Sequence, residues 1–349
     1  MIKPDLLKLD SHDMYRHIQD FYKQVIDGIA LTTAITFDDL HYTGFKNIIL
    51  AGMGGSAIGG EILKSFLKRQ LKIPFEIHRN YGLPGTADKH TLVICSSYSG
   101  GTEETLSAFD KAVELQCKVI CITTGGKLRE RAMQKNIPVV NIPSGLMPRE
   151  ALGYSFAPLL ILFGKLGLCD DYTESLRTCA EVMKERNAEY SVEHEPNAAY
   201  DLAGQLAGKI VIIYSGPDYL DAVGMRWKGQ ICENAKQLAF CNVFPEFNHN
   251  ELVGWESAGK ISDKYIILIL RNEDDHPQIA RRMDIVGKIL KQKGIDIVEQ
   301  WSTGNNILER MFSLIQLGDY ASYYLALVNN VDPTPIDLIN YMKQELDSK

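Results

Sequence analysis

Short apolar runs alternate with amphipathic segments in the first half of the chain. Compact apolar runs predict buried strands, and apolar positions at helical spacing predict helices. Strands and helices in this order are typical of a parallel sheet covered on both faces. The expected strands are Ile48–Ala51, Phe75–Ile77, Thr91–Ser96, Val119–Thr123 and Val139–Ile142, and the expected helices are Ser56–Gln70, Glu103–Gln116 and Lys127–Lys135.

The same pattern returns after a helical stretch. Residues 10–35 are amphipathic and predict one or two helices on the outside of the first domain. Residues 143–197 predict mostly helix, and from Lys209 onwards strands and helices alternate again. The expected strands there are Ile210–Ser215, Tyr265–Leu270 and Asp296–Trp301, the expected helices are Asp218–Leu238, His276–Gln292 and Asn306–Asn329, and a short final helix follows Pro335.

This organisation predicts an α/β fold with two similar doubly wound parallel-sheet domains, joined by helices and followed by a C-terminal helix. A length of 349 residues is comfortable for two domains. The expected parts are an N-terminal domain with leading helices at 1–150, a helical bridge at 151–197, a C-terminal domain at 198–330 and a C-terminal helix at 331–349.

Composition and charge indicate the cellular location and the kinds of partner to expect. A formal net charge of −7 argues against nucleic acid as the main partner but allows an anionic metabolite. The seven cysteines are an odd number scattered through apolar segments, which indicates a reduced, cytoplasmic protein. No apolar run reaches the length of a membrane span, so we expect no membrane partner. Cys117 and Cys121 share a strand without a second ligand pair, so buried thiols are favoured over a metal site.

A glycine-rich turn at Leu50–Gly60 follows the first strand and opens a helix. Free N–H groups and the helix dipole make such a turn a natural anion site. Gly52-x-Gly54-x-x-Ala57 fits a dinucleotide-binding pattern, with Glu76 as the ribose-binding acid. Alternatively, Gly55 and the Ser56 hydroxyl hold a phosphomonoester, or the glycines serve close packing only.

A second loop supplies further hydroxyl groups. Ser97, Ser99 and Thr102 directly follow the strand at Thr91–Ser96 and precede a helix. Loops at the carboxyl ends of adjacent parallel strands meet at the switch point, so these hydroxyls and Ser56 can face one pocket. Helix capping by Thr102 is the alternative, but capping needs only one hydroxyl. The two loops together therefore favour a phosphate.

At this point the sequence resembles a known family. Gly54–Ser56 and Ser97–Thr105 are similar to the sugar isomerase (SIS) domain, which binds phosphosugars. Arg149–Tyr154, Cys232–Asn234 and Phe247–Glu251 are similar to the bifunctional phosphoglucose/phosphomannose isomerases of that superfamily. The resemblance runs from about residue 45 to the C-terminus, and it implies that both predicted domains are SIS domains.

The resemblance implies a reaction without metal or other cofactor. Glucose 6-phosphate or mannose 6-phosphate would interconvert with fructose 6-phosphate by ring opening and proton transfer through a cis-enediolate. Glu233 matches the family's base, and Arg149 matches the arginine that stabilises the enediolate. His249 matches the histidine for ring opening, which the neighbouring subunit contributes in this family, so a homodimer is implied. Without the resemblance, Glu233 reads as solvated helix surface, His249 as a loop residue and Arg149 as part of a surface or interdomain ion pair.

Two C-terminal residues and two glutamates complete the candidates. The family has a lysine on its final helix and a threonine that helps to admit mannose 6-phosphate, and Lys343 and Thr334 are the matching residues. Glu246 and Glu251 flank His249 and either orient it or face water.

Two other functions remain as alternatives. A non-catalytic phosphosugar-binding regulator would need the hydroxyl loops but not Glu233, Arg149 or His249, and it usually carries a basic recognition helix that this acidic chain does not offer. A nicotinamide-dependent dehydrogenase would use the glycine-rich turn for its dinucleotide.

Overall fold

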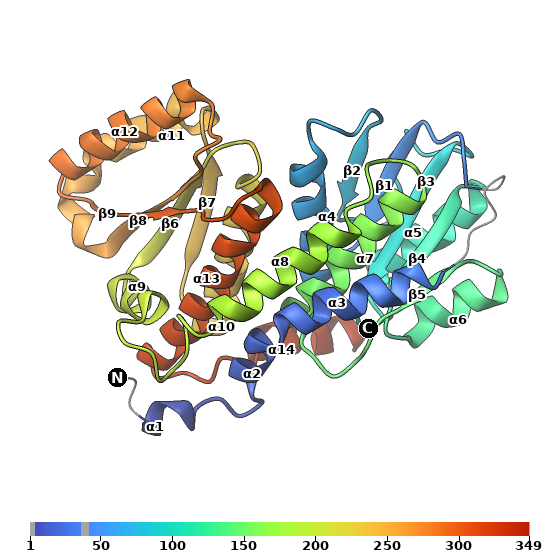
Figure 1. The fold of residues 1–349 in the computed structure, drawn as a ribbon, viewed down its shortest axis with the longest axis horizontal. Coiled ribbons are helices and arrows are strands. Elements are labelled where there is room, and N and C mark those ends of the chain that lie inside the picture. Colours follow the sequence, from blue (N-terminus) through green and yellow to red (C-terminus); the bar gives the residue numbers. More distant parts are fainter. Residues whose placement is uncertain (1–3, 36–41, 349) are drawn as a thin grey trace. The chain divides into compact units, whose positions relative to one another are not determined.

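The chain forms two compact units (Figure 1). A computed structural model describes residues 4–35 and 42–348. The ends of the predicted N-terminal domain and C-terminal helix, at 1–3 and 349, and the stretch 36–41 lie outside the described residues. We call the two parts the first-sheet unit, made of Gln19–Glu185 with Asn306–Glu309, and the second-sheet unit, made of Met1–Ile18, Arg186–Asn305 and Arg310–Lys349.

The first-sheet unit is built on five parallel strands in the order β2-β1-β3-β4-β5. Every residue of β3 is buried, as expected for a central strand with helices on both faces. The chain order reverses between β1 and β3, so the predicted doubly wound topology is confirmed. The strands are β1 (Asn47–Ala51), β2 (Phe75–His78), β3 (Thr91–Ser97), β4 (Lys118–Thr123) and β5 (Val139–Asn141).

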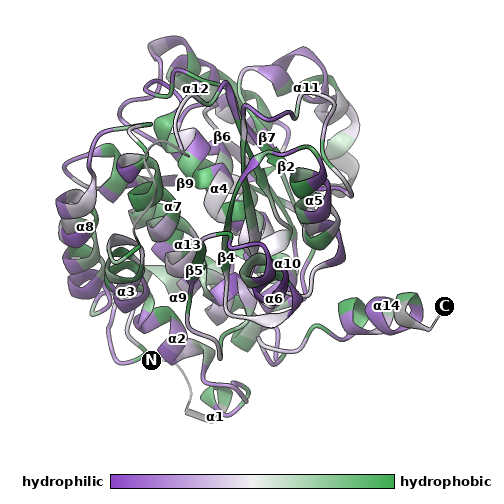
Figure 2. Ribbon diagram, turned by 90° about the vertical axis from the view of Figure 1, so that its right-hand side faces the viewer, coloured by the Kyte–Doolittle hydropathy of each residue, from purple (hydrophilic) through white to green (hydrophobic). Residues whose placement is uncertain are grey.

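Helices cover the two faces of this sheet. One core cluster joins alternate residues of β3 and β4, among them Val93, Cys95 and Cys121, to Phe109 and Leu128 of α5 and α6. The helix α4 contacts β1 and β2, and α7 packs on α4 and on α3. The hydrophobic strands stand out against the mixed helices in Figure 2. The helices are α3 (Phe21–Thr33), α4 (Gly54–Leu67), α5 (Glu103–Glu114), α6 (Gly126–Gln134), α7 (Leu152–Lys165) and α8 (Thr173–Arg186).

The second-sheet unit repeats this plan with four parallel strands in the order β7-β6-β8-β9. Its switch point lies between β6 and β8, which correspond in order to β1 and β3 of the first sheet. The strands are β6 (Ile210–Ser215), β7 (Ala239–Val243), β8 (Tyr265–Arg271) and β9 (Asp296–Trp301).

The strand β7 is absent from the expectations above. The helix expected to reach Leu238 ends at Ala235 instead, because Lys236 takes a left-handed backbone conformation with φ 52°. An edge strand needs one covered face at most, and Phe240 and Cys241 are exposed. The short apolar run Leu238–Cys241 directly follows the helical pattern, and the sequence prediction assigns Leu238 to that helix, so the strand is missed.

The remaining helices belong mainly to the second-sheet unit. Of the helices expected over residues 10–35, α3 packs on α7 in the first-sheet unit, whereas α2 falls within the second-sheet unit. The helices not yet given are α1 (Pro4–Leu7), α2 (Met14–Gln19), α9 (Ala198–Leu206), α10 (Asp221–Ala235), α11 (Glu251–Gly254), α12 (Pro277–Gln292), α13 (Ile307–Val328) and α14 (Asp337–Asp347). The 3₁₀ turns are η1 (Pro148–Glu150), η2 (Glu246–His249) and η3 (Trp255–Lys264).

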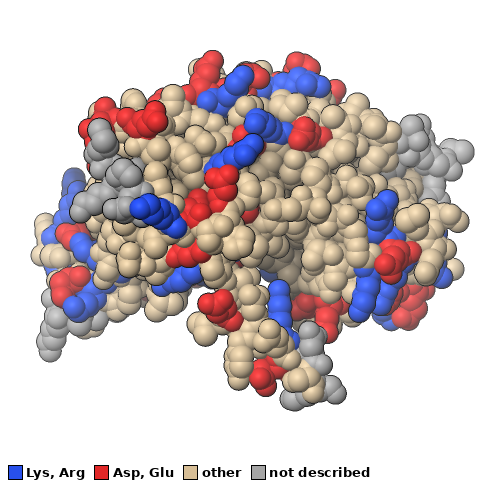
Figure 3. Space-filling model, turned by 90° about the horizontal axis from the view of Figure 1, so that it is seen from below, with Lys and Arg blue, Asp and Glu red and all other residues tan. Residues whose placement is uncertain are grey.

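Surface features complete the description. On the face seen in Figure 3, basic and acidic side chains are interspersed rather than separated. The last helix, α14, exposes the large apolar side chains of Leu338, Met342 and Leu346. Within the described ranges, no helix combines the length and the apolar character that crossing a bilayer requires.

Candidate functional site

The glycine-rich turn lies at the carboxyl end of β1 and opens α4. Gly54 begins the helix with φ +49°, and Met53 before it makes no side-chain capping hydrogen bond. A Cβ at Gly52 would lie 2.8 Å from the carbonyl oxygen of Ser96, and one at Gly55 would lie 2.3 Å from that of Pro148. Close packing therefore accounts for Gly52 and Gly55, and the same packing brings the turn against both neighbouring loops.

The two hydroxyl-bearing loops meet as predicted. Ala51 pairs with Cys95 across β1 and β3, so the loops that follow these strands start side by side. The Ser56 Oγ accepts a hydrogen bond from the Tyr98 N–H at 3.0 Å. Since this bond uses a lone pair of Ser56, the hydroxyl hydrogen is left to donate elsewhere.

Hydroxyl groups also cluster within the second loop. Ser97 Oγ lies 2.9 Å from Thr102 Oγ1 and accepts the Gly100 N–H at 3.1 Å. Ser99 is exposed, and its Oγ accepts the Gly101 N–H at 3.3 Å. Thr102 stands at the N-cap of α5 but makes no side-chain capping hydrogen bond. The capping interpretation of Thr102 is therefore wrong.

A third loop, which follows β4, packs against the second loop. Gly100 has φ +68°, and a Cβ there would lie 1.8 Å from the carbonyl oxygen of Gly125. Thr124 donates to the Tyr98 carbonyl through its N–H at 3.2 Å and its hydroxyl at 2.7 Å. Contacts on this side leave little room for the hydroxyl loop to move.

Arg149 reaches the same region from the turn η1. Its side chain is buried, so the surface alternative for Arg149 is wrong. The turn is held by Gln24 of α3, whose Nε2 donates to the Glu150 carbonyl at 2.8 Å and whose Oε1 accepts the Gly153 N–H at 3.2 Å. The backbone of Pro148 and Arg149 in turn packs against Gly55.

Tyr98 connects the segment that precedes η1 to the hydroxyl-bearing loops. Its phenolic oxygen accepts the Leu146 N–H at 3.0 Å, while its backbone contacts Ser56 and Thr124. Burial raises the pKa of the Tyr98 phenol, so the group stays protonated at neutral pH. One residue therefore aligns three loops of the first-sheet unit.

In the second-sheet unit, Glu233 lies half-buried on the last turn of α10. Arg226 of the same helix forms a buried two-point ion pair with Asp319 of α13, with Nε–Oδ1 at 3.0 Å and Nη2–Oδ2 at 2.7 Å. Burial raises the pKa of Asp319, and Arg226 opposes that rise. Gln230 donates to Asp319 and Asn234 to Ser322, each at 3.0 Å, so three successive turns fix the rotation of the helix that carries Glu233.

Thr334 and Lys343 lie in the C-terminal tail of the same unit. Thr334 is buried, and its N–H donates to Asp332 Oδ1 at 2.9 Å. Lys236 beside Glu233 donates through Nζ to the Pro333 carbonyl at 2.9 Å, which places Thr334 next in sequence to a contact with the end of α10. Lys343 is exposed on α14.

His249 ends the turn η2 and is exposed. Its flanking glutamates have other partners. The Glu251 carboxylate accepts hydrogen bonds from Asn242 Nδ2 at 2.7 Å and from the Tyr214 hydroxyl, so it does not simply face water. Glu246 accepts a hydrogen bond from Asn250 Nδ2 at 3.0 Å. Both contacts anchor residues close to His249 in the sequence.

The corresponding loops of the second sheet differ in chemistry. Gly216 follows β6 as Gly52 follows β1, but a Cβ at Gly216 would lie 2.5 Å from the Asp275 Oδ1. Burial raises the pKa of Asp275 to about 6, although its other oxygen accepts the Asn272 N–H at 3.0 Å. A carboxylate therefore stands at this switch point, where the first sheet has hydroxyls.

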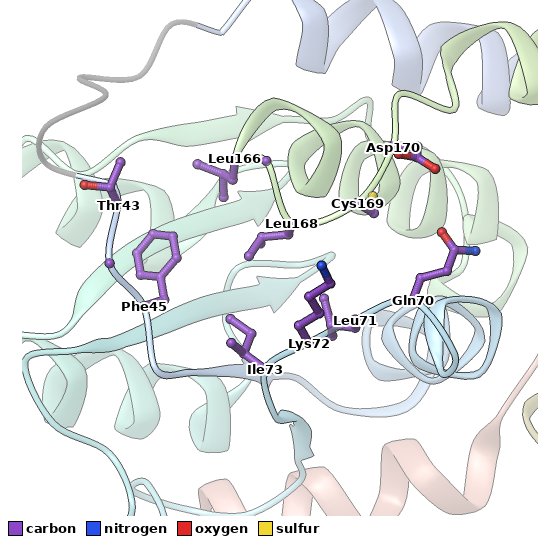
Figure 4. Close-up of a pocket in the computed structure, with 12 residues that line it drawn as sticks. Thr43, Phe45, Gln70, Leu71, Lys72, Ile73, Leu166, Leu168, Cys169 and Asp170 are labelled. Atoms are coloured by element: carbon purple, nitrogen blue, oxygen red, sulfur yellow. The ribbon is translucent and has the colours of Figure 1, made fainter.

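Two further features lie away from these loops. Figure 4 shows a cavity of 540 Å³ near Phe45 and Ile73, which precede β1 and β2 and so mark the amino ends of the strands. Its lining combines apolar side chains with polar ones, among them Gln70, Lys72 and Asp170. In the part of the chain that the structure describes, no three His, Cys, Asp or Glu residues gather as a metal-ion site would require.

The structure thus gathers Gly55, the candidate hydroxyls and Arg149 in one unit, and Glu233, Thr334, His249 and Lys343 in the other. Sequence reasoning missed the residues that hold them: Tyr98, Gln24 and Lys236. Tyr98 lies inside the hydroxyl-rich motif and could have been singled out there, whereas nothing in the sequence ties Gln24 to residue 150 or Lys236 to residue 333.

Comparisons with known proteins agree with this arrangement. Residues 41–142 match the SIS domain model, and residues 195–346 match the model described as "Bacterial phospho-glucose isomerase C-terminal SIS domain". The chain is 46% identical over 301 residues to a bifunctional phosphoglucose/phosphomannose isomerase of Caldicellulosiruptor bescii, covering 86% of this chain and 89% of the relative. It is 34% identical to the protein of that name from Aquifex aeolicus, covering 96% and 98%. A hypothetical protein of Thermus thermophilus shares the fold with a TM-score of 0.74 at 14% identity, covering 99% of this chain and 93% of its own.

Proposed function

Because this chain belongs to the bifunctional phosphoglucose/phosphomannose isomerase family, we propose that it interconverts glucose 6-phosphate and mannose 6-phosphate with fructose 6-phosphate. The observation that carries the proposal is the hydrogen bond between Tyr98 and Ser56, which joins two hydroxyl-bearing loops at a helix N-terminus. A binding regulator needs these loops too, but it has no use for a base and a buried arginine.

The substrate phosphate binds at the first-sheet unit. Ser56, Ser97, Ser99 and Thr102 donate hydrogen bonds to its oxygens, and Gly55 lets the backbone approach. These donors are neutral, and the N-terminus of α4 adds a favourable field. The phosphate lies far from C1 and C2 of the sugar, so it anchors the substrate without taking part in the reaction.

The sugar end requires an acid–base pair and a cation. Glu233 moves a proton between C1 and C2, and Arg149 stabilises the negative charge that develops on the enediolate. His249 assists the opening of the sugar ring, Lys343 assists near the ring, and Thr334 helps to admit mannose 6-phosphate. Support for these roles comes from the matched motifs, together with the fixed helix that carries Glu233 and the buried position of Arg149.

The working protein is a homodimer in which His249 serves the neighbouring subunit. We place it in the cytoplasm, in glycolysis or gluconeogenesis, supported by seven cysteines that form no disulfide. The domain boundaries at 150, 197 and 330 remain predictions.

A coupled assay tests the proposal. Glucose 6-phosphate and mannose 6-phosphate are offered separately, and fructose 6-phosphate is measured as the product. Both should be converted, and Glu233→Gln should lower kcat by about 1,000-fold because the proton transfer loses its base. Binding of a non-reactive phosphosugar analogue by Glu233→Gln should stay within about two-fold, because the phosphate anchor is intact.

Two results would count against this function, and a third would count against the role of Glu233. Absence of turnover with retained phosphosugar binding would favour a regulator. A thermal shift with NAD but none with a hexose 6-phosphate would favour a dehydrogenase. Full activity of Glu233→Gln would place the base elsewhere.

A further inference from the structure

One lysine ties the C-terminal end of α10 to the tail of the chain. Lys236 follows the helix with φ 52°, and its Nζ donates to the carbonyl oxygens of Glu233 at 2.9 Å and Asn234 at 3.3 Å. The same Nζ donates to the Pro333 carbonyl at 2.9 Å, across 97 positions of sequence. The three hydrogens of the ammonium group are thus directed at three backbone carbonyls.

The position suits a positive charge. The last carbonyls of a helix have no partner within the helix and carry the negative end of its dipole. Lys236 supplies a cation there, and its left-handed backbone turns the side chain back over the last turn. Such charge-assisted bonds are shorter and stronger than neutral ones.

Further hydrogen bonds join the end of α10 to α13 and to the residue that follows α13. Asn329, just after α13, donates through Nδ2 to the Ala235 carbonyl and to Gln237 Oε1, both at 3.0 Å. Asn234 contacts Ser322 of α13 at 3.0 Å. The end of α10 is therefore held to α13 on one side and, through Lys236, to the tail on the other.

We propose that Lys236 is a positioning residue that holds the candidate base Glu233 and the Pro333–Thr334 segment in one fixed arrangement; this rests on the proposed function. Lys236 itself acts through the backbone of the residues it joins. A catalytic base must lie within a fraction of an ångström of its productive place, so release of this tie lowers the rate of proton transfer.

Two variants remove the tie and keep the backbone conformation. Glycine and asparagine both tolerate the left-handed region, so Lys236→Gly and Lys236→Asn should fold. The matched control is Gln116→Gly, because Gln116 follows α5 of the other unit with φ 57°. Any effect of placing glycine in a left-handed position after a helix appears in the control as well.

The first measurement is hydrogen–deuterium exchange of the purified full chain. Both Lys236 variants should exchange faster in peptides that cover residues 332–341, whereas peptides that cover β1 and α4 should exchange as in the wild type. The second measurement is steady-state kinetics with both hexose 6-phosphates. The Lys236 variants should lose about ten-fold in kcat with KM changed less than about two-fold, and the ratio of mannose to glucose activity should shift.

Either arm can overturn the proposal. Exchange over residues 332–341 equal to that of the wild type would show that Lys236 does not hold the tail. Faster exchange with kinetics equal to those of Gln116→Gly would show that the tie does not position the site. A wild-type chain without isomerase activity would overturn the proposed function and the kinetic consequence with it, while the exchange result would still decide whether Lys236 holds the tail.

Discussion

At the scale of single residues, the hydroxyls of the first-sheet unit are already oriented by the protein. Ser56 and Ser97 each accept a backbone N–H, at 3.0 and 3.1 Å. An accepted bond leaves the Ser56 hydrogen to donate to a ligand, whereas Ser97 and Thr102 share one hydrogen between their oxygens and leave the other to donate. Residues placed in this way lose little conformational entropy when an anion binds.

The double variant Ser97→Ala with Ser99→Ala tests these donors. We expect KM for both hexose 6-phosphates to rise by about 100-fold, with kcat within about three-fold of wild type, because a remote phosphate contributes nearly equally to the ground state and the transition state. Steady-state kinetics measure both constants. Ser175→Ala on α8 is the control, and it should behave as wild type. A fall in kcat at unchanged KM would mean that these hydroxyls take part in the reaction instead.

At the scale of elements, the turn η1 and the first turn of α4 depend on each other. Gly55 fits against the carbonyl group of Pro148, and the next residue along η1 is Arg149. Gln24 and Glu150 hold η1 from the other side. Arg149 is therefore placed by a backbone contact with the glycine-rich turn, and not by its own side chain alone.

Gly55→Ala tests that contact. A methyl group there would lie 2.3 Å from a backbone oxygen, so the turn and η1 must separate. We expect kcat/KM to fall by about 100-fold and the melting temperature to fall by roughly 5 °C, as measured by kinetics and calorimetry. Gly85→Ala is the matched control, because a Cβ at Gly85 meets nothing within 4 Å. Wild-type activity of Gly55→Ala would disprove the dependence of Arg149 on this contact.

The same elements show how far the sequence alone could lead. Strong local signals were sufficient for the strands of the first sheet and for the meeting of the loops after β1 and β3, because apolar runs and strand order determine both. The edge strand β7 is not predicted, because its short apolar run directly follows α10 and its first apolar residue, Leu238, is assigned to that helix. The contacts of Gln24 with Glu150 and of Lys236 with Pro333 link positions far apart in the chain, and no local pattern encodes such pairs.

At the scale of the whole molecule, the candidate roles imply cooperation between chains. In the proposed homodimer, each site combines Glu233 of one subunit with His249 of the other. A cyclic dimer then has two equivalent sites. If one chain lacks Glu233 and its partner lacks His249, both defects therefore fall in one of the two sites, and the other site is complete.

Mixing two inactive variants tests this sharing. Glu233→Gln and His249→Ala chains, unfolded and refolded together in equal amounts, should recover about a quarter of wild-type activity, because half of the dimers are mixed and each mixed dimer has one complete site. The coupled isomerase assay measures the recovery. Each variant refolded alone is the control. No recovery, with mixed dimers verified by mass spectrometry, would place His249 and Glu233 in the same chain's site.

The carboxylate at the second switch point has an evolutionary consequence. If the two sheets descend from one duplicated ancestor, Asp275 stands over Gly216 where that ancestor could have gripped a substrate anion. A carboxylate repels a phosphate, so this switch point lacks the anion-binding chemistry of the first one. We therefore expect each chain to bind one phosphosugar, at the loops of the first sheet.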